Sequence, residues 1–361
     1  MRISILIHAE SPFGHQYGRI FSQRGHDVEL LSLSAYEGSG TDVPVKVVGP
    51  PGFKPWESSS RLLPYLKTVL PLRRAVRRFA PDILFASYLS SGGMLACLTG
   101  HDHIVLSAIG SDVVSRVSSR LWRAIFRWEV RRSVLVHLVS EPLAQILSER
   151  IGVPREKMLV APIGVDTRLL GFVDPADRPG TGRIICTRGH RPVYGQETLV
   201  KAIARLKQRG IACHVTFTHA HPWVKETRRL VGVHGVEDRV TFIPGFEAEE
   251  LPSLLAGADV YVSASYSDGT SVSLLECLST GTFPVVSDIP ANRPWVEHGR
   301  NGLLFPPGDD EALADRLAEA LARPELRAAA APISRRIAVE KADIYGEADR
   351  LLAAFESCLN E

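Results

Sequence analysis

Ala258-Asp-Val-Tyr-Val-Ser-Ala-Ser265 and, one residue later, Ser267-Asp-Gly-Thr-Ser-Val-Ser-Leu-Leu-Glu276 form the most informative stretch of this chain. The first part is an apolar run that ends in small residues, which predicts a buried strand and its exit. The second part continues through Leu274-Leu-Glu-Cys-Leu-Ser-Thr-Gly281, a short helix closed by glycine. A strand that leads directly into a helix is the repeating unit of an α/β fold.

The start of this helix predicts an anion site. The amides of Thr270, Ser271 and Val272 would point out of the helix N-terminus, where unpaired donors and the helix dipole bind phosphate. Glu276 would lie roughly a turn and a half further along the helix, placed to accept hydrogen bonds from a vicinal diol such as ribose. The pattern therefore indicates a nucleotide site. Asp268 could instead serve only as the N-cap of the helix.

Short apolar strands alternate with amphipathic helices along the whole chain, which predicts doubly wound parallel sheets. Two Rossmann-like domains are expected, at residues 1–165 and 183–335, with a loop-rich hinge at 166–182 and a helical tail at 336–361. The expected strands are residues 3–7, 28–31, 83–86, 104–107 and 134–138 in the first domain, and 184–187, 213–218, 240–243, 260–264 and 284–287 in the second.

Composition is that of an ordinary globular protein. The 361 residues allow two cores, and hydrophobic residues make up 45% and charged residues 23%. A net charge of +2 does not suggest nucleic-acid binding. Five scattered cysteines without a CxxC pair favour a reducing compartment, and the apolar N-terminal run is better interpreted as a strand than as a signal peptide. A cytoplasmic protein is expected, because no apolar run approaches the length of a membrane span.

The motifs that follow Asp268 and Glu276 resemble those of a known family. Gly281-Thr-Phe-Pro-Val-Val-Ser-Asp288 is followed by Pro290-Ala-Asn-Arg-Pro-Trp-Val-Glu297 and by Gly299-Arg-Asn-Gly-Leu-Leu-Phe-Pro-Pro-Gly308. In this order, after two acidic residues that flank seven others, they resemble the family 4 retaining glycosyltransferases over essentially the whole chain. The resemblance implies the GT-B architecture, in which two Rossmann-like domains face each other and the last helix crosses back onto the first domain. Asp268 stands where most members carry glutamate.

The resemblance also implies roles for residues of the second domain. Arg188 would clamp the donor pyrophosphate at the carboxyl end of a strand and stabilise the leaving group. Tyr194 stands where the family usually has a lysine, so that Arg191 or His190 would have to supply a second cation. The base would lie at Pro244-Gly-Phe-Glu247, where Phe246 either stacks on the base or fills the core, next to Glu247.

In the first domain, the family places a glycine-rich loop after the first strand, near the donor phosphate. Here Phe13-Gly-His-Gln16 supplies only Gly14, with His15 at the expected mouth of the cleft. Many family members have a histidine just before the glycine of Gly110-Ser-Asp112, and here that position is Ile109. Asp112 is then the nearest polar group. It could equally serve only as a cap of the helix that begins here. Asp268, Arg188, His15 and Asp112 are the catalytic candidates. The nucleotide-sugar-binding candidates are Gly14, Arg188, Arg191, Tyr194, Phe246, Glu247, Thr270, Ser271, Val272 and Glu276.

Two basic helices raise the question of a membrane partner. One helix contains Arg73-Arg-Ala-Val-Arg-Arg78. In the other, Arg120, Arg123, Arg127 and Arg131 form one stripe, and the helix also carries tryptophan and phenylalanine. The stripe is compatible with a solvated face of a packed helix. It is also compatible with peripheral docking on the inner face of an anionic membrane that holds a lipid-linked acceptor.

The expected function is metal-independent, retaining transfer of a sugar from a nucleotide-sugar donor to a hydroxyl acceptor. The sequence contains no Asp-x-Asp motif for a divalent metal, and neither a metal site nor a cofactor is expected. A UDP-sugar is favoured over GDP-mannose as the donor, on family frequency alone. The expected setting is polysaccharide, lipopolysaccharide or glycolipid assembly, by analogy with the family. The alternatives are a nucleotide-sugar epimerase of the same fold and a degenerate homologue that only binds nucleotide.

Overall fold

The structure is a computed structural model that describes residues 1–8, 11–36, 42–51, 53, 63–178, 180–218 and 223–360. The chain divides into two compact units, Met1–Ile163 with Tyr345–Glu361 and Gly164–Ile344. Residues 166–182, expected as a hinge, fall inside the second unit, and so do residues 336–344 of the expected C-terminal segment.

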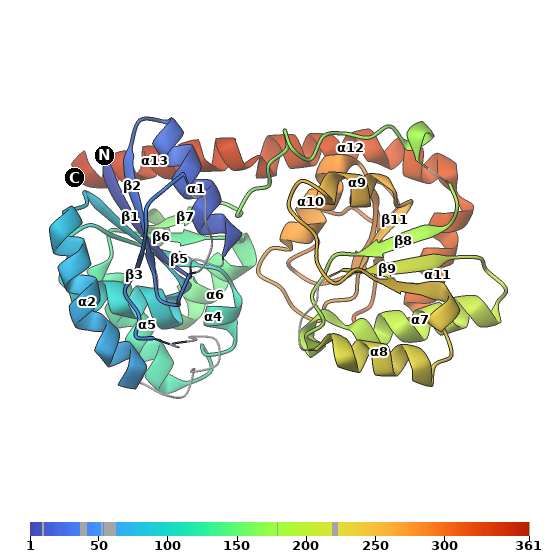
Figure 1. Ribbon diagram of the computed structural model, residues 1–361, viewed down its shortest axis with the longest axis horizontal. Coiled ribbons are helices and arrows are strands. Elements are labelled where there is room, and N and C mark those ends of the chain that lie inside the picture. The colour runs from blue at the N-terminus through green and yellow to red at the C-terminus, as the bar shows by residue number, and fades with distance from the viewer. Residues whose placement is uncertain are drawn as a thin grey trace. The chain divides into compact units, whose positions relative to one another are not determined.

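The first unit contains a seven-stranded parallel sheet in the order β3-β2-β1-β4-β5-β6-β7 (Figure 1). The sequence predicted five of these strands and missed β3 and β7, which are three-residue edge strands and too short for a clear pattern. Its strands are β1 (Arg2–Ile7), β2 (Asp27–Ser32), β3 (Val45–Val47), β4 (Ile83–Ser87), β5 (Ile104–Ala108), β6 (Leu135–Leu138) and β7 (Met158–Val160).

Helices follow the strands of the first unit, and one of them comes from the far end of the chain. They are α1 (Pro12–Gln23), α2 (Leu63–Phe79), the π-helix η1 (Tyr88–Gly93), α3 (Met94–Thr99), α4 (Ser111–Val114), α5 (Arg120–Arg132), α6 (Glu141–Ile151) and α13 (Ile344–Asn360). The ring of Phe355 in α13 lies 6.0 Å from that of Phe21 and 5.5 Å from that of Phe85, between centroids. The expectation that the last helix packs on the first unit is confirmed.

The second unit contains a six-stranded parallel sheet in the order β10-β9-β8-β11-β12-β13. Helices α7, α8 and α11 cover one face, and α9, α10 and α12 cover the other (Figure 1). The strands are β8 (Arg183–Cys186), β9 (His214–Phe217), β10 (Val240–Phe242), β11 (Val260–Ser263), β12 (Phe283–Ser287) and β13 (Leu303–Phe305). The helices are α7 (Gln196–Gln208), α8 (Val224–Val233), α9 (Leu251–Ala256), α10 (Val272–Thr280), α11 (Asp310–Ala322) and α12 (Pro324–Ala342).

The predicted fold class of two Rossmann-like parallel-sheet domains is therefore confirmed. In each sheet the strand order reverses once, between β1 and β4 in the first and between β8 and β11 in the second. Ligands of open α/β sheets bind outside the carboxyl ends of the strands at such a switch point. None of the helices in the described ranges has both the length and the apolar content needed to cross a bilayer.

Candidate functional site

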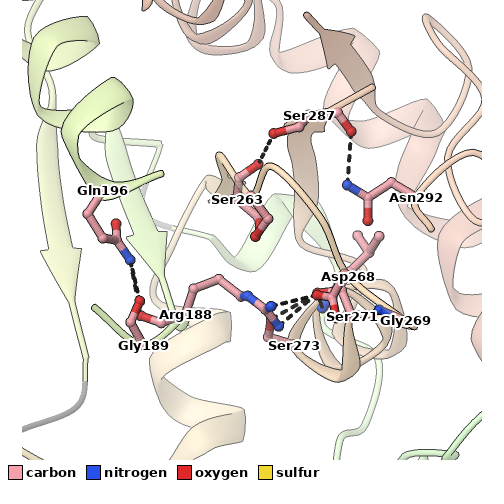
Figure 2. Close-up of polar contacts among 12 residues, drawn as sticks. Arg188, Gly189, Gln196, Ser263, Asp268, Gly269, Ser271, Ser273, Ser287 and Asn292 are labelled. Carbon is pink, nitrogen blue, oxygen red and sulfur yellow. Dashed lines mark hydrogen bonds and ion pairs between the residues drawn. The ribbon is translucent and has the colours of Figure 1, made fainter. Parts of the chain in front are cut away.

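The candidate site lies at the switch point of the second sheet. Arg188 follows β8 and Asp268 follows β11, so the parallel strands bring both residues to the same edge. Nη2 of Arg188 lies 2.5 Å from Oδ2 of Asp268, and the two side chains are only 10% and 17% exposed (Figure 2). Two predicted site residues that are 80 positions apart in the sequence thus form a sheltered ion pair.

The guanidinium of Arg188 is held on several sides. Its Nη1 donates to the hydroxyl groups of Ser271 at 3.3 Å and Ser273 at 3.4 Å. Its carbon Cζ lies 4.2 Å from the centre of the Tyr194 ring, a cation–π contact. The amide of Gln196 donates to the backbone carbonyl groups of Arg188, at 3.3 Å, and Gly189, at 2.7 Å, which fixes the backbone beneath the side chain.

Helix α10 begins beside this guanidinium. Its N-cap is Ser271, whose hydroxyl accepts a hydrogen bond from the amide of Leu274. Asp268 accepts instead from the amide of Gly269, at 2.9 Å, so the interpretation of Asp268 as N-cap of this helix is wrong. The amides of Val272 and Ser273 are among the first of the helix, and such amides have no partner within a helix. The N-terminal end of α10 and the cation of Arg188 therefore lie together.

Glu276 lies further along α10 and is partly buried. Burial raises the pKa of its carboxyl group to about 7, and the neighbouring Arg188 guanidinium opposes this shift. The group is therefore poised between its neutral and ionised forms near neutral pH. The ionised form only accepts hydrogen bonds, whereas the neutral form also donates one from its O–H group.

Three other predicted residues of the second unit take different positions. Tyr194 stacks under Arg188, whereas Arg191 is exposed at the start of the turn Pro192–Tyr194. His190 is buried, with ring nitrogens 3.0 Å from the hydroxyl of Thr227 and 3.1 Å from the carbonyl of Thr218. It is thus engaged in the core and does not replace the lysine of the resembling family.

The predicted base-binding loop, Pro244-Gly-Phe-Glu247, has one residue packed on the core and one exposed. Phe246 packs against the apolar cluster that surrounds α9 and α10, which favours its role as a core residue. Glu247 is exposed, and its backbone amide donates to the carboxylate of Glu250 at 2.7 Å. Thr270 is buried immediately before the N-cap of α10.

The sequence did not indicate three further residues near the site, Ser273, Tyr261 and Asn292. Ser273 bridges Arg188 and the hydroxyl of Tyr261, which lies 2.7 Å from the serine oxygen. The side-chain amide of Asn292 donates to the carbonyl of Ser287 at 2.9 Å, while its oxygen is buried and has no partner among the described residues (Figure 2). Only the position of Asn292 after a strand of the sheet could have indicated it.

The predicted residues of the first unit lie near its own switch point. Gly14 is inside α1, and a Cβ atom there would lie 2.6 Å from Cγ2 of Ile7, so only glycine allows this approach. The ring of His15 lies 5.3 Å from that of Tyr36. Asp112 is buried and accepts hydrogen bonds from the amides of Leu89, Ile109 and Gly110 at 2.8–3.2 Å. Burial raises the pKa of Asp112, and these amides oppose the shift.

Within the described ranges, no three His, Cys, Asp or Glu side chains gather in a way that could hold a metal ion.

Two family models match the chain. Residues 177–336 match the model described as glycosyl transferases group 1, and residues 15–169 match glycosyltransferase family 4. The match over residues 15–169 covers most of the first unit and extends just inside the second, and the other match lies wholly in the second unit. Together they leave out residues 1–14, 170–176 and 337–361.

Several known proteins are similar to this chain, each over a different share of its length. The putative colanic acid biosynthesis glycosyltransferase WcaL of Escherichia coli is 31% identical over 58% of this chain and 53% of its own length. The chain thus spans about half the length of the first curated relatives that it matches. A GDP-mannose-dependent alpha-(1-6)-phosphatidylinositol monomannoside mannosyltransferase of Mycobacterium tuberculosis is 24% identical over 86% of this chain and 85% of its own. Among solved structures, the Anabaena protein HepE in complex with UDP covers 99% of this chain and 100% of its own, with a TM-score of 0.78 at 19% identity.

Proposed function

Because the chain belongs to the family 4 glycosyltransferases of the GT-B fold, we propose that it transfers a sugar from a nucleotide-sugar donor to a hydroxyl group of an acceptor. The observation that carries this proposal is the meeting of Arg188 with the N-terminus of α10 at the switch point of the second sheet. A guanidinium and the amides of a helix N-terminus both bind phosphate.

In the proposed donor complex, the diphosphate lies at the start of α10 and Arg188 exchanges part of its contact with Asp268 for a phosphate oxygen. Asp268 then accepts hydrogen bonds from hydroxyl groups of the donor sugar, and Glu276 accepts them from the ribose. The contact of Nη1 of Arg188 with the hydroxyl of Ser271 supports this exchange, because Ser271 caps α10 and the guanidinium therefore already lies at the start of the helix.

The proposed reaction retains the configuration of the anomeric carbon and uses no metal ion or cofactor. The bond between the anomeric carbon and the β-phosphate oxygen breaks, the acceptor oxygen attacks from the same face, and the departing phosphate oxygen takes the acceptor proton. Arg188 and the end of α10 stabilise the negative charge that develops on the diphosphate. The protein contributes orientation and electrostatic stabilisation rather than a covalent nucleophile.

A UDP-sugar is the proposed donor class, supported by the complex of the similarly folded HepE protein with UDP. The name of the mycobacterial relative specifies GDP-mannose, so the two nucleotides are the first to compare. Titration calorimetry with UDP and GDP is expected to give tighter binding of UDP, with affinity lost in Arg188→Ala. Tighter binding of GDP would reject the base assignment and leave the transfer reaction standing.

Turnover separates transfer from the two alternatives. For a glycosyltransferase, free nucleoside diphosphate accumulates only when an acceptor hydroxyl is present. An epimerase would convert the donor sugar without an acceptor. A degenerate homologue would bind UDP and consume no donor in a panel of nucleotide sugars. This alternative is tested because Tyr194, Ile109 and Asp268 depart from the usual residues of the family.

The proposed setting is polysaccharide, lipopolysaccharide or glycolipid assembly, which the name of the colanic acid relative supports. A peripheral membrane contact is part of this proposal. Leu66 and Leu70 of α2 are each 61% exposed one turn apart, and Leu121 of α5 is 67% exposed beside the exposed Arg120. Sedimentation with vesicles is expected to show binding to anionic lipid that decreases with salt; equal binding to neutral vesicles would exclude this contact.

A further inference from the structure

Two arginine side chains contact the C-terminal end of α10, opposite to the proposed anion site. The last four carbonyl groups of a helix have no partner within it. Here Nη2 of Arg178 donates to the carbonyl oxygen of Thr280 at 2.7 Å. Nη1 of Arg335 donates to the carbonyl oxygen of Ser279 at 3.0 Å. The helix therefore ends against two positive charges, which the helix dipole favours at a C-terminus.

Arg178 connects this end of α10 to the end of α9. The residue lies shortly before β8, and its Nη1 donates to the carbonyl oxygens of Leu255, in the last turn of α9, and of Ala258, at 2.9 Å each. The same atom donates to the hydroxyl of Thr282 at 3.0 Å. Burial lowers the pKa of Arg178, but a guanidinium stays protonated in proteins. One charged side chain thus joins two helices that cover the same face of the sheet.

Arg335 connects the same end of α10 to residues that precede the second sheet. It lies in α12, and its Nη1 also donates to the carbonyl oxygen of Leu170 at 2.8 Å and to the hydroxyl of Ser279 at 2.7 Å. Its Nη2 donates to the carbonyl oxygen of Thr167 at 3.0 Å. The hydroxyl of Ser279 in turn donates to the carbonyl oxygen of Leu170 at 2.7 Å. The guanidinium therefore holds α12, α10 and residues 167–170 in one arrangement.

The short length of α10 couples its two ends. Its nine residues span roughly 13 Å at the rise of an α-helix, and so short a helix moves as one rigid element. A shift of its last carbonyl groups therefore also shifts the amides of its first turn. Arg188 follows β8 and does not belong to α10, so its distance to those amides depends on what holds the helix. Misplacement by about 1 Å can cost about 100-fold in a site that orients a reacting group.

We propose that Arg178 and Arg335 are positioning residues for the donor diphosphate. They hold α10 where its first amides and the guanidinium of Arg188 bind the same diphosphate, and neither of the two residues touches the donor. The inference rests on the proposed donor site and adds two residues at the opposite end of α10.

The affinity that a second phosphate group adds to a nucleotide measures this geometry. It is the ratio of the Kd of UMP to that of UDP, obtained by titration calorimetry of the full chain, with GMP and GDP as a second pair. Each ratio compares ligands with the same base and ribose, so it does not depend on the base that the site prefers. The variants are Arg335→Met and Arg178→Met, which keep an unbranched side chain and lose the charge, and the conservative Arg335→Lys. Arg336→Met, an exposed neighbour in α12, is the matched control.

The native chain is expected to bind the diphosphate at least about tenfold more tightly than the monophosphate, because hydrogen bonds to a charged group are among the stronger ones. Arg335→Met and Arg178→Met should each lower this ratio by about threefold or more, with little change in the Kd of the monophosphate. Arg335→Lys should give a ratio between those of the native chain and Arg335→Met, because it keeps a positive charge at the helix end. Arg336→Met should keep the native ratio.

Thermal unfolding of the same variants separates positioning from stability. An arginine that only stabilises the fold would lower the unfolding temperature when replaced and leave the ratio unchanged. That result in both methionine variants would overturn the proposal. If neither methionine variant folds, Arg335→Lys carries the test, and a ratio equal to that of the native chain overturns the proposal.

The behaviour of the native chain keeps this result separate from the proposed function. A native chain that binds UDP or GDP, with variants that keep its ratio, rejects only the positioning role. A native chain that binds monophosphate and diphosphate equally well rejects the diphosphate site at α10 itself. A native chain that binds neither diphosphate rejects the proposed donor site, and this inference with it.

Discussion

Arg188 is the residue on which the electrostatics of the second-unit site depend. It contacts Asp268, the Tyr194 ring and the hydroxyl groups of Ser271 and Ser273, the first of which caps α10. A buried ion pair is a weak source of stability, but removing one partner leaves the other charge buried and uncompensated. Arg188 and Asp268 are therefore expected to respond differently to substitution.

Arg188→Ala is expected to lower the transfer rate by about 100-fold or more, because the charge on the departing diphosphate loses its stabilising donor. Measurement of kcat alongside thermal unfolding tests this. Arg188→Lys is the matched control, since it keeps the charge but loses the two-pronged geometry and should recover only part of the rate. Near-native turnover of Arg188→Ala would disprove the assignment of this residue to the leaving group.

Glu276 predicts a pH dependence of donor binding. Its pKa is raised to about 7, so the carboxyl group is neutral below that pH and ionised above it. Since the ionised form accepts the ribose hydroxyl groups better, the donor KM should fall as the pH rises from 6 to 8. The effect on stability has the opposite sign: a raised pKa favours the neutral folded state, and this contribution is lost as the pH rises through 7. In Glu276→Gln the step in KM should disappear; a step that persists would trace to another group.

At the scale of elements, α10 carries the proposed anion site, and a specific residue caps each of its ends. Ser271 caps the beginning, and Gly281 closes the end with a φ of +72°. The helix is only nine residues long, so its packing and its caps hold it in place rather than its intrinsic propensity.

Gly281→Ala should destabilise the protein more than Gly235→Ala. Both glycines have a positive φ, +72° and +61°, so each substitution costs about 1 kcal/mol in backbone strain. A Cβ atom at Gly281 would also lie 2.7 Å from Cε2 of Phe172, whereas nothing lies within 4 Å at Gly235. Denaturant unfolding of the two variants measures the difference. Equal free energies of unfolding would mean that Phe172 moves aside without cost.

At the scale of the whole molecule, α13 makes the first unit depend on the end of the chain. Phe355 is fully buried among Phe21, Phe85 and their neighbours, and Arg24 pairs with Asp349 at 2.8 Å. The first unit is completed only when the C-terminal helix is present.

Phe355→Ala is expected to cost about 3–5 kcal/mol, the usual range for a buried phenylalanine, and to act on the first unit. Hydrogen exchange should rise in β1 and β4 and stay unchanged in β11 and β12. Phe305→Ala, in a buried strand of the second unit, is the matched control and should show the reverse pattern. Faster exchange in both units from either variant would show that they unfold together.

The amino-acid sequence determined the features that depend on neighbouring residues. Alternating apolar strands and amphipathic helices predicted both parallel sheets, and the stretch from Asp268 to Glu276 predicted the helix α10 that begins at Val272. The nucleotide site at the start of this helix stays a prediction. These signals are local, because strand and helix periods and helix termini repeat over a few residues. The three-residue edge strands β3, β7 and β13 carried too little of this signal to be found, whereas the equally short edge strand β10 falls within the predicted strand 240–243.

Tertiary structure determined which distant residues meet. It paired Asp268 with Arg188 rather than with the amides of α10, stacked Tyr194 under the guanidinium and buried His190. It also brought the rings of His8 and Tyr88 together at the first switch point, 5.8 Å apart between centroids. Each of these contacts depends on the order of strands in a sheet, and strand order is set by the packing of whole elements, which no local pattern records.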